Sequence, residues 1–345
     1  MIVLSLFDGM SATQQALKEL GVVVDRYYAS EIDKYAIQIT QKPENFPDTI
    51  QLGDVCNVSV ADIGHVDLIV AGSPCQDLSF AGKGKGLAGE RSGLFFEAIR
   101  IIKEAKAINP NVKVLIENVK MKQEYMDAMS DALSEALGER VTPQLLNSRL
   151  VSAQNRQRLY WYNWETIEEP EDRGIMLKDI LEDGYVDRDK SHCIDANYFK
   201  GGNLKSYFEK HRRQLVFSKD GLCHVGDADL NGHGYLKRVY HSSGKAPTLT
   251  SNGGGNREPK VYTGDMKFRK LTPLECERLQ TFPDGYCDGV SNTQAYKMLG
   301  NSFTVEMVKC ILSPIVEELE DGESDINNAY GYHNATIDPR NVIEE

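Results

Sequence analysis

Short hydrophobic runs alternate with amphipathic segments from the start of the chain to Leu137. Runs that are apolar at nearly every position are typical of strands buried on both faces of a parallel sheet, and apolar residues at helical spacing indicate covering helices. The alternation therefore predicts a doubly wound α/β sheet. We expect strands at Ile2–Phe7, Arg26–Ser30, Thr49–Leu52, Asp67–Ala71 and Val112–Ile116, and helices at Ala12–Leu20, Lys34–Thr40, Phe95–Ala107 and Glu124–Leu137.

The pattern changes near Glu165. From there to about Asn256 the sequence is turn-rich, glycine-rich and polar, with no long periodic helix, which indicates a separate unit. Thr272-Pro273 then begins a capped helix, and residues 295–312 return to helix-and-turn sequence. We predict a first domain at 1–164, a second unit with a supporting helix at 165–285, a return to the first domain at 286–314 and a tail at 315–345.

Charge and cysteine content narrow the class of protein. The net charge is −12, but from Ile315 onward nine acidic residues face one arginine, which indicates a solvated tail. Basic residues gather instead after Cys75 and between Arg188 and Arg213, where they are candidates to contact phosphates. Seven cysteines without a Cys-x-x-Cys pair indicate a reducing compartment, the cytoplasm. No signal peptide or membrane span is expected.

One thiol follows directly on a buried strand. The run that ends at Ala71 continues as Gly72-Ser73-Pro74-Cys75-Gln76, and functional groups of parallel-sheet enzymes lie at such strand ends. The next segment, 77–93, holds five glycines together with Lys83, Lys85 and Arg91. This arrangement favours a nucleophile beneath a closing loop, and a small buried cysteine is the alternative.

The first strand is followed by a tight turn at Gly9 and a helix start, an arrangement that presents backbone amides to a ligand. The turn lacks the full Gly-x-Gly-x-x-Gly pattern, which disfavours a dinucleotide. Glu31 and Asp54 lie at the ends of the next two strands, and together with the first turn they favour a nucleoside ligand that need not carry phosphate. Taken singly, each of these acids is more often a helix cap.

A further buried strand, Val114–Val119, contains the carboxylate of Glu117 near its end. A buried acid is unfavourable unless it is partnered, so Glu117 is a candidate acid, base or base-binding group. Arg156 and Arg158 alternate before an aromatic strand and are expected to point the same way, where they could pair with Glu117 or hold a carbonyl. Two surface arginines are the alternative.

Two Cys/His pairs, His192-Cys193 and Cys223-His224, raise the question of a zinc site. Their spacing matches no standard zinc finger. We therefore expect no metal.

In this order the motifs closely resemble those of the DNA (cytosine-5) methyltransferases of phage and bacterial type, over nearly the whole chain. The resemblance covers the family's cofactor turn, nucleophile motif, base-holding motif, arginine motif, supporting helix and pocket-closing motif. The matching segments are Phe7-Asp8-Gly9, Pro74-Cys75-Gln76, Glu117-Asn118-Val119, Gln154–Arg158, Arg269–Gln280 and Gly300-Asn301-Ser302.

Two segments depart from the commoner family pattern. Met10-Ser11-Ala12 replaces a glycine-rich continuation, and Gly300–Thr304 ends in Phe-Thr. Both variants resemble the phage and de novo branches of the family. The tRNA-methylating branch and a catalytically dead DNA-binding relative are the alternatives; the Cys-Phe-Thr signature of the tRNA branch is not evident, which favours DNA.

The resemblance implies a Rossmann-like S-adenosylmethionine-dependent methyltransferase sheet with a smaller, irregular target-recognition domain at 165–285. It implies S-adenosyl-L-methionine as cofactor and S-adenosyl-L-homocysteine as product. The cofactor-binding residues it implies are Phe7, Asp8, Gly9, Met10, Ser11, Glu31, Ile32, Asp54, Val55, Ser73, Pro74, Leu94, Asn301 and Ser302.

For catalysis the resemblance implies Cys75, Glu117, Arg156 and Arg158. The thiolate would add to carbon 6 of a flipped cytosine, and carbon 5 would take the methyl group. The DNA contacts it implies are Gln76, Ser79, Lys83, Lys85 and Thr248. The partner is double-stranded DNA in a prokaryotic or phage-infected cell, with a separately acting restriction endonuclease as a candidate and no membrane. The recognition sequence follows no transferable code.

Overall fold

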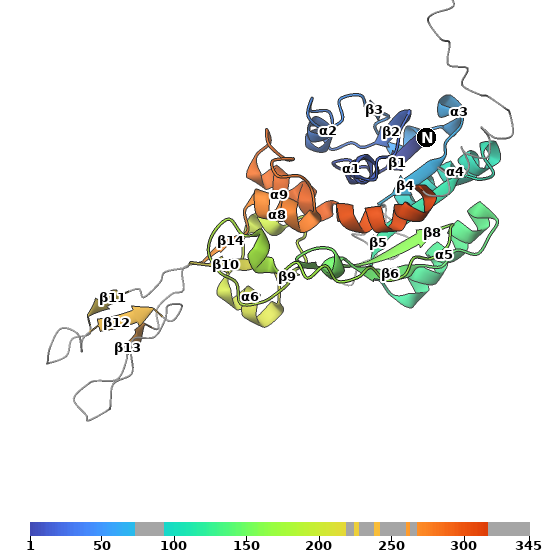
Figure 1. Cartoon of the computed structure of the whole chain (residues 1–345). Helices are drawn as coiled ribbons and strands as arrows, with labels where there is room; N and C mark the ends of the chain where they lie inside the picture. Colours follow the sequence, from blue (N-terminus) through green and yellow to red (C-terminus); the bar gives the residue numbers. More distant parts are fainter. Residues whose placement is uncertain (73–92, 219–223, 228–237, 242–259, 263–267, 317–345) are drawn as a thin grey trace, which may run out of the picture.

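The computed structural model describes residues 1–72, 93–218, 224–227, 238–241, 260–262 and 268–316. Its centre is a seven-stranded sheet in the order β3-β2-β1-β4-β5-β8-β6 (Figure 1). The strands are β1 (Ile2–Leu6), β2 (Arg26–Ser30), β3 (Ile50–Gln51), β4 (Leu68–Ala71), β5 (Lys113–Val119), β6 (Gln144–Asn147) and β8 (Gln157–Tyr162).

The first five strands pair in parallel, as the sequence predicts for a doubly wound sheet. β8 is antiparallel to both β5 and β6 and lies between them. The carboxyl ends of β1 to β5 therefore share one edge, and β8 begins at that edge. This brings the motifs after each parallel strand together with the arginine motif.

Helices cover both faces of this sheet. They are α1 (Ala12–Glu19), α2 (Lys34–Thr40), α3 (Val60–Ile63), α4 (Gly93–Ile108) and α5 (Gln123–Leu137), followed late in the chain by α8 (Pro273–Gln280), α9 (Asn292–Asn301) and a helix over 305–316. The predicted strands and helices are confirmed to within a few residues at each end. β5 ends at Val119, as the buried strand expected at Val114–Val119 does, and so includes Glu117.

Alternate residues of the strands face two hydrophobic clusters. Val3 and Leu115 face a cluster that holds α1, α2, α9 and the helix over 305–316. Leu4 and Ile116 face a second cluster, which holds α3, α4 and α5. The parallel strands are buried on both faces, which explains their continuous hydrophobic runs.

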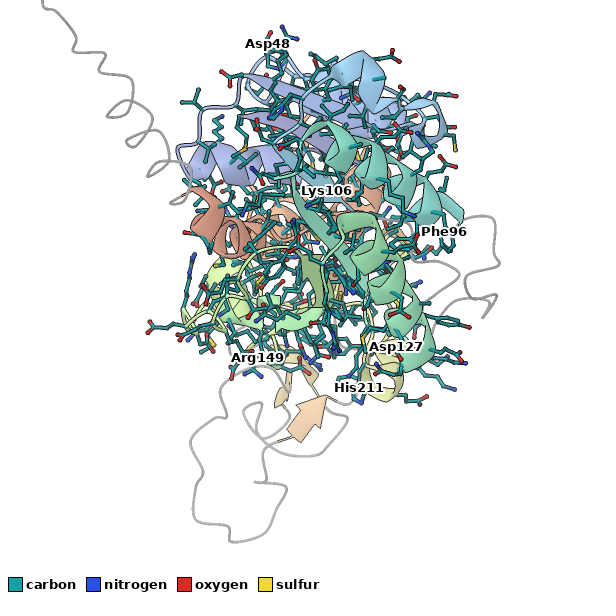
Figure 2. All side chains as sticks on the ribbon, turned by 90° about the vertical axis from the view of Figure 1, so that its right-hand side faces the viewer. Asp48, Phe96, Lys106, Asp127, Arg149 and His211 are labelled. Atoms are coloured by element: carbon teal, nitrogen blue, oxygen red, sulfur yellow. The ribbon has the colours of Figure 1, made fainter. Side chains whose placement is uncertain are left out.

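The turn-rich part of the chain forms small pairings. β7 (Gln154–Asn155) pairs with β9 (Ser191–His192), and β10 (Leu215–Phe217) pairs with β14 (Phe268–Lys270), next to α6 (Leu204–Lys210). A third sheet of β11 (His224–Asp227), β12 (Arg238–His241) and β13 (Lys260–Tyr262) stands apart from the main body in Figure 1. Figure 2 shows Asp48, just before β3, at the opposite end of the molecule from Arg149 and His211.

The predicted helix cap at Thr272 is confirmed. The Thr272 hydroxyl accepts a hydrogen bond from Glu275 N at 3.2 Å, and the Glu275 carboxylate accepts one from Thr272 N at 2.8 Å. Arg269 also donates to Glu275 at 2.8 Å, so this fully buried carboxylate has a cation beside it. The predicted domain boundaries stay predictions. Leu177, on the far side of the first boundary, packs in the same cluster as Val3.

No helix in the described ranges is both long enough and apolar enough to cross a membrane.

Candidate active site

The turn after β1 has a left-handed backbone at three positions, with φ of 57° at Phe7, 61° at Gly9 and 58° at Ser11. Residues other than glycine adopt this left-handed region at an energetic cost, and such strain concentrates at functional sites. The amide of Gly9 donates to the Glu31 carboxylate at 2.8 Å. The turn is therefore tied to the end of β2.

Asp8 lies beneath this turn and holds it from inside. Its carboxylate accepts hydrogen bonds from the Tyr27 hydroxyl, at 2.8 Å, and from the Ser11 hydroxyl. Burial raises the pKa of Asp8 to about 6, although these hydrogen bonds act in the opposite direction. Met10 and Ser11 are fully buried, so the side chains of Asp8, Met10 and Ser11 face the interior. At these positions the backbone faces the sheet edge.

Glu31 and Ile32 directly follow β2, at the edge of the sheet where the parallel strands end. The Glu31 carboxylate accepts from the backbone amides of Gly9, Ile32 and Asp33 at 2.7 to 2.8 Å. A carboxylate has about four acceptor positions, so one remains for a ligand hydroxyl. Ile32 is 75% exposed, which leaves a large apolar side chain next to that acid.

Asp54 follows β3 and is exposed, with one carboxylate oxygen accepting from Cys56 N at 2.9 Å. Val55, the next residue, is buried in the second cluster, so its side chain faces away from the edge. Asp54 thus has the helix-cap role that the sequence leaves open, and it is also hydrogen-bonded by the Cys56 thiol. Because the carboxylate is exposed, it can still accept from a ligand amine.

The late motif reaches the same edge from α9. Asn301 is exposed, whereas Ser302 is buried and its carbonyl accepts from Arg156. The ring of Phe303 lies against Gly72 so closely that an added Cβ there would be 2.9 Å from it. Leu94, at the start of α4, is partly buried against the second cluster. The late motif therefore packs directly on the strand end that precedes Cys75.

These residues fit an adenosyl cofactor. The carboxyl ends of β2 and β3 carry three chemical groups in sequence order. They are an acid with one acceptor position left, an exposed apolar side chain and a second, exposed acid. A ribose diol, an adenine ring and its exocyclic amine require these chemical groups.

Glu117 and Arg158 form a buried ion pair, with Arg158 Nε 2.9 Å from Glu117 Oε1. Glu117 is 8% exposed. Burial raises the pKa of the Glu117 carboxyl, and the positive charges of Arg158 and Arg156 offset part of that rise. The predicted pairing of Glu117 with the arginine motif is confirmed. A raised pKa means that the carboxyl keeps its proton to a higher pH than usual, and a protonated carboxyl can share that proton with a ring nitrogen.

Arg156 takes a different position from Arg158. It is 3% exposed, and its guanidinium donates to the carbonyls of Ser302 at 2.7 Å, Ile194 at 3.2 Å and Gly300 at 3.5 Å. Arg156 therefore joins the segment after β9 to the end of α9. Its expected place beside Cys75 stays a prediction, because Cys75 lies outside the described residues.

Cys193 is a site residue that the sequence reasoning missed. Its sulfur lies 3.4 Å from Arg156 Nη1 and 3.9 Å from Arg158 Nη2. From the sequence, Cys193 is considered only as one half of a Cys/His pair that could bind zinc. No local pattern reveals the contact, because the arginines precede Cys193 by 35 residues or more.

Several predicted site residues lie outside the described ranges. They are Ser73, Pro74, Cys75, Gln76, Ser79, Lys83, Lys85 and Thr248. Cys223 of the second Cys/His pair also lies outside them. Within the described ranges, no three His, Cys, Asp or Glu side chains are grouped to hold a metal ion.

Comparisons with known proteins agree with the site. The family model of C-5 cytosine-specific DNA methylase matches residues 1–317. The chain is 27% identical to the orphan methyltransferase M.SPBetaI of Bacillus phage SPbeta, with 94% of this chain and 99% of the relative covered. It is 28% identical to the type II methyltransferase M.HhaI of Haemophilus parahaemolyticus, with 89% and 92% covered.

A solved structure shares the fold. It is a putative DNA modification methyltransferase encoded within an Escherichia coli prophage, with a TM-score of 0.56, 19% identity, and 93% of this chain and 99% of that chain covered. The family match spans nearly the whole chain, including the buried Glu117–Arg158 pair and the turn after β1. The chain therefore belongs to the C-5 cytosine-specific DNA methylases, and its enzyme class is DNA (cytosine-5-)-methyltransferase.

Proposed function

We propose that this enzyme methylates cytosine within a specific DNA sequence, on a base flipped out of the duplex, through a covalent adduct with Cys75. The observation that carries the proposal is the buried Glu117–Arg158 pair, which lies at the sheet edge where the chain continues from Gly72 towards Cys75. A cytosine inside a duplex cannot reach a buried carboxyl, so flipping is required.

The cofactor in this proposal is S-adenosyl-L-methionine, which supplies a methyl group on a positively charged sulfur. Glu31 holds the ribose hydroxyls, Ile32 packs on the adenine, and Asp54 accepts from its amine. Asn301 closes the far side of the pocket. The backbone of the Phe7–Gly9 turn, tied to Glu31, lines the remaining wall.

On the base, the Cys75 thiolate forms a bond to carbon 6, and the electron pair of the carbon 5–carbon 6 double bond moves into the ring. Glu117 holds ring nitrogen 3 and the exocyclic amine, and its proton neutralises the charge that builds up on the ring. Arg158 keeps Glu117 in place and holds the base carbonyl. The enamine carbon 5 would then take the methyl group, with S-adenosyl-L-homocysteine as the product. Solvent water would remove the carbon 5 proton, and the electron pair of that C–H bond re-forms the carbon 5–carbon 6 double bond as the bond between carbon 6 and sulfur breaks. The thiolate leaves, and the proton on ring nitrogen 3 returns to Glu117.

A further observation concerns the partners of the enzyme. The phage relative is named an orphan methyltransferase, which favours an enzyme that acts without a dedicated endonuclease. Gln76, Ser79, Lys83 and Lys85 are proposed to contact the DNA from the segment after Cys75. Thr248 is proposed to contact it from the recognition region.

The test is covalent trapping. Bisulfite sequencing of DNA from cells that express the chain first identifies the target. With S-adenosylmethionine present, a duplex with 5-fluorocytosine at that target should then form an adduct that survives denaturing electrophoresis, because after methyl transfer fluorine cannot leave carbon 5 as a cation. Peptide mapping should place the DNA on Cys75.

The matched controls are the unmodified duplex, which should release the enzyme, and Cys75→Ser, which should bind DNA without an adduct. An adduct on another residue, or none, contradicts the covalent mechanism. Efficient trapping of tRNA with no trapping of DNA replaces the DNA assignment with the tRNA alternative.

A further inference from the structure

The guanidinium of Arg158 has a partner at each of its three nitrogens. Nε pairs with Glu117 at 2.9 Å, and Nη1 donates to the carbonyl of Gln157 at 2.8 Å. Nη2 faces the sulfur of Cys193 at 3.9 Å. Glu117 and Gln157 lie on β5 and β8, whereas Cys193 comes from the segment that follows β9. Cys193 is therefore the one of these three partners that lies outside the main sheet.

The same sulfur also accepts from Arg156 Nη1 at 3.4 Å. Arg156 in turn donates to the carbonyls of Ile194 and Ser302. An added Cβ on Gly300 would be 2.2 Å from the Asp195 carbonyl carbon, so the two segments touch backbone to backbone. The position of Cys193 is fixed by these contacts.

The Cys193 thiol lies beside two positive charges, and it donates to the carbonyl of Ile194 at 3.4 Å. Burial alone raises the pKa of a thiol, but the adjacent Arg156 and Arg158 outweigh it and bring the pKa of Cys193 below its ordinary value. Cys310 is also partly buried, and there burial raises the thiol pKa. The charged groups that face Cys193 in the described part of the chain are Arg156 and Arg158, with Glu117 behind Arg158.

We propose that Cys193 is a positioning residue for the base-holding pair. Its sulfur fixes the plane of the Arg158 guanidinium, so that Nε meets Glu117 in the orientation that the flipped base requires. A planar guanidinium held at three nitrogens has little freedom to rotate. The inference rests on the proposed function, in which Glu117 and Arg158 hold the cytosine.

The first experiment compares Cys193→Ala, Cys193→Ser and the control Cys310→Ala in the full chain, with kcat, KM for S-adenosylmethionine and Tm measured for each. Cys193→Ala should lower kcat between about tenfold and 100-fold while KM and Tm stay near those of the unaltered enzyme. Cys193→Ser keeps an acceptor and should recover most of kcat, and Cys310→Ala should leave it unchanged.

A kcat for Cys193→Ala within twofold of the unaltered enzyme overturns the proposal. The proposal is also overturned if Cys193→Ala and Cys193→Ser change kcat, KM and Tm for the worse to the same extent. Such a result indicates a purely structural role for Cys193.

A second readout does not depend on activity. The rate of Cys193 alkylation by iodoacetamide, followed by peptide mass spectrometry, should rise at a lower pH than that of Cys310. Alkylation of both thiols over the same pH range overturns the proposal. An inactive unaltered enzyme with the expected alkylation profile would instead count against the proposed function.

Discussion

Arg158 and Glu117 pair diagonally across two antiparallel strands: Glu117 is opposite Tyr160 and Arg158 is opposite Val119, yet Arg158 Nε reaches Glu117 Oε1 at 2.9 Å. Leu115 and Tyr160 pack in one cluster on the face of the sheet that these residues share. The carboxylate therefore lies at the rim of a hydrophobic layer. Among the described residues, the cations that act on this carboxylate are Arg156 and Arg158 of the arginine motif.

Arg158→Ala should destabilise the protein in a pH-dependent way. Removing one partner of a buried pair costs about 3–5 kcal/mol, because the other charge stays buried. Burial already raises the pKa of Glu117, and losing Arg158 raises it further. A raised pKa in the folded state means that stability is present at low pH and is lost as the pH rises through that pKa. Urea unfolding at pH 5 and pH 8 should therefore show the larger loss at pH 8.

The control for this substitution is Arg149→Ala, since Arg149 is an exposed arginine at the surface (Figure 2). It should change the free energy of unfolding by no more than about 0.5 kcal/mol at either pH. A loss from Arg158→Ala that is equal at both pH values would contradict the assignment of the pH dependence to Glu117.

Gly300→Ala should destabilise the crossing of α9 with the segment after β9. A Cβ at Gly300 would lie 2.2 to 2.4 Å from backbone atoms of Asp195 and Ala196, which cannot move aside as a flexible side chain can. Overpacking of this kind costs about 1–3 kcal/mol or more. Thermal unfolding should show a lower Tm, with Gly93→Ala as the control. Among the described residues, a Cβ at Gly93 meets no atom within 4 Å, so that variant should be neutral or slightly stabilised.

The sequence could predict β1 to β5 because strands buried on both faces are hydrophobic along their whole length. It could also suggest the Glu117–Arg158 pair, since a buried acid and a spaced pair of arginines require each other. It could not predict the partners of Arg156, which are the backbone carbonyls of Ile194, Gly300 and Ser302. Backbone carbonyls are common to every residue and leave no signature in a sequence.

The contacts of Cys193 could not be predicted from the sequence for a related reason. Its contacts depend on how the segment after β9 crosses the end of α9, and this crossing is a tertiary feature with no local period. The side-chain directions of Met10 and Ser11 were equally hidden, because a left-handed residue at Ser11 turns the start of α1 inward. The resemblance identified this turn without fixing which of its atoms face the ligand.

Asp8→Asn should remove one component of the pH dependence of stability. Burial raises the pKa of Asp8 to about 6 from an ordinary value of about 4, so its ionisation in the folded state is unfavourable. The corresponding stability is present below pH 4 and falls by roughly 3 kcal/mol as the pH rises through 6.

The measurement is the difference in free energy of unfolding between the unaltered protein and Asp8→Asn at pH 4.5 and pH 7.5. The unaltered protein should lose stability relative to the variant at the higher pH, since the introduced side-chain amide stays neutral and can still bond to Tyr27 and Ser11. A difference that does not change with pH would show that Asp8 titrates near its ordinary value.

Asp54→Ala should weaken binding of S-adenosylmethionine while leaving the fold intact. Asp54 is exposed at the carboxyl end of β3, and its carboxylate accepts from Cys56 N and can still accept from an adenine amine. Loss of that hydrogen bond costs about 1 to 3 kcal/mol, or a roughly 5-fold to 150-fold rise in Kd measured by calorimetry. Asp62→Ala is the matched control, because Asp62 is an equally exposed acid on the neighbouring α3 and removes the same charge. Equal Kd values for the two variants would place the adenine elsewhere, whereas a rise confined to Asp54→Ala would fix it at the end of β3.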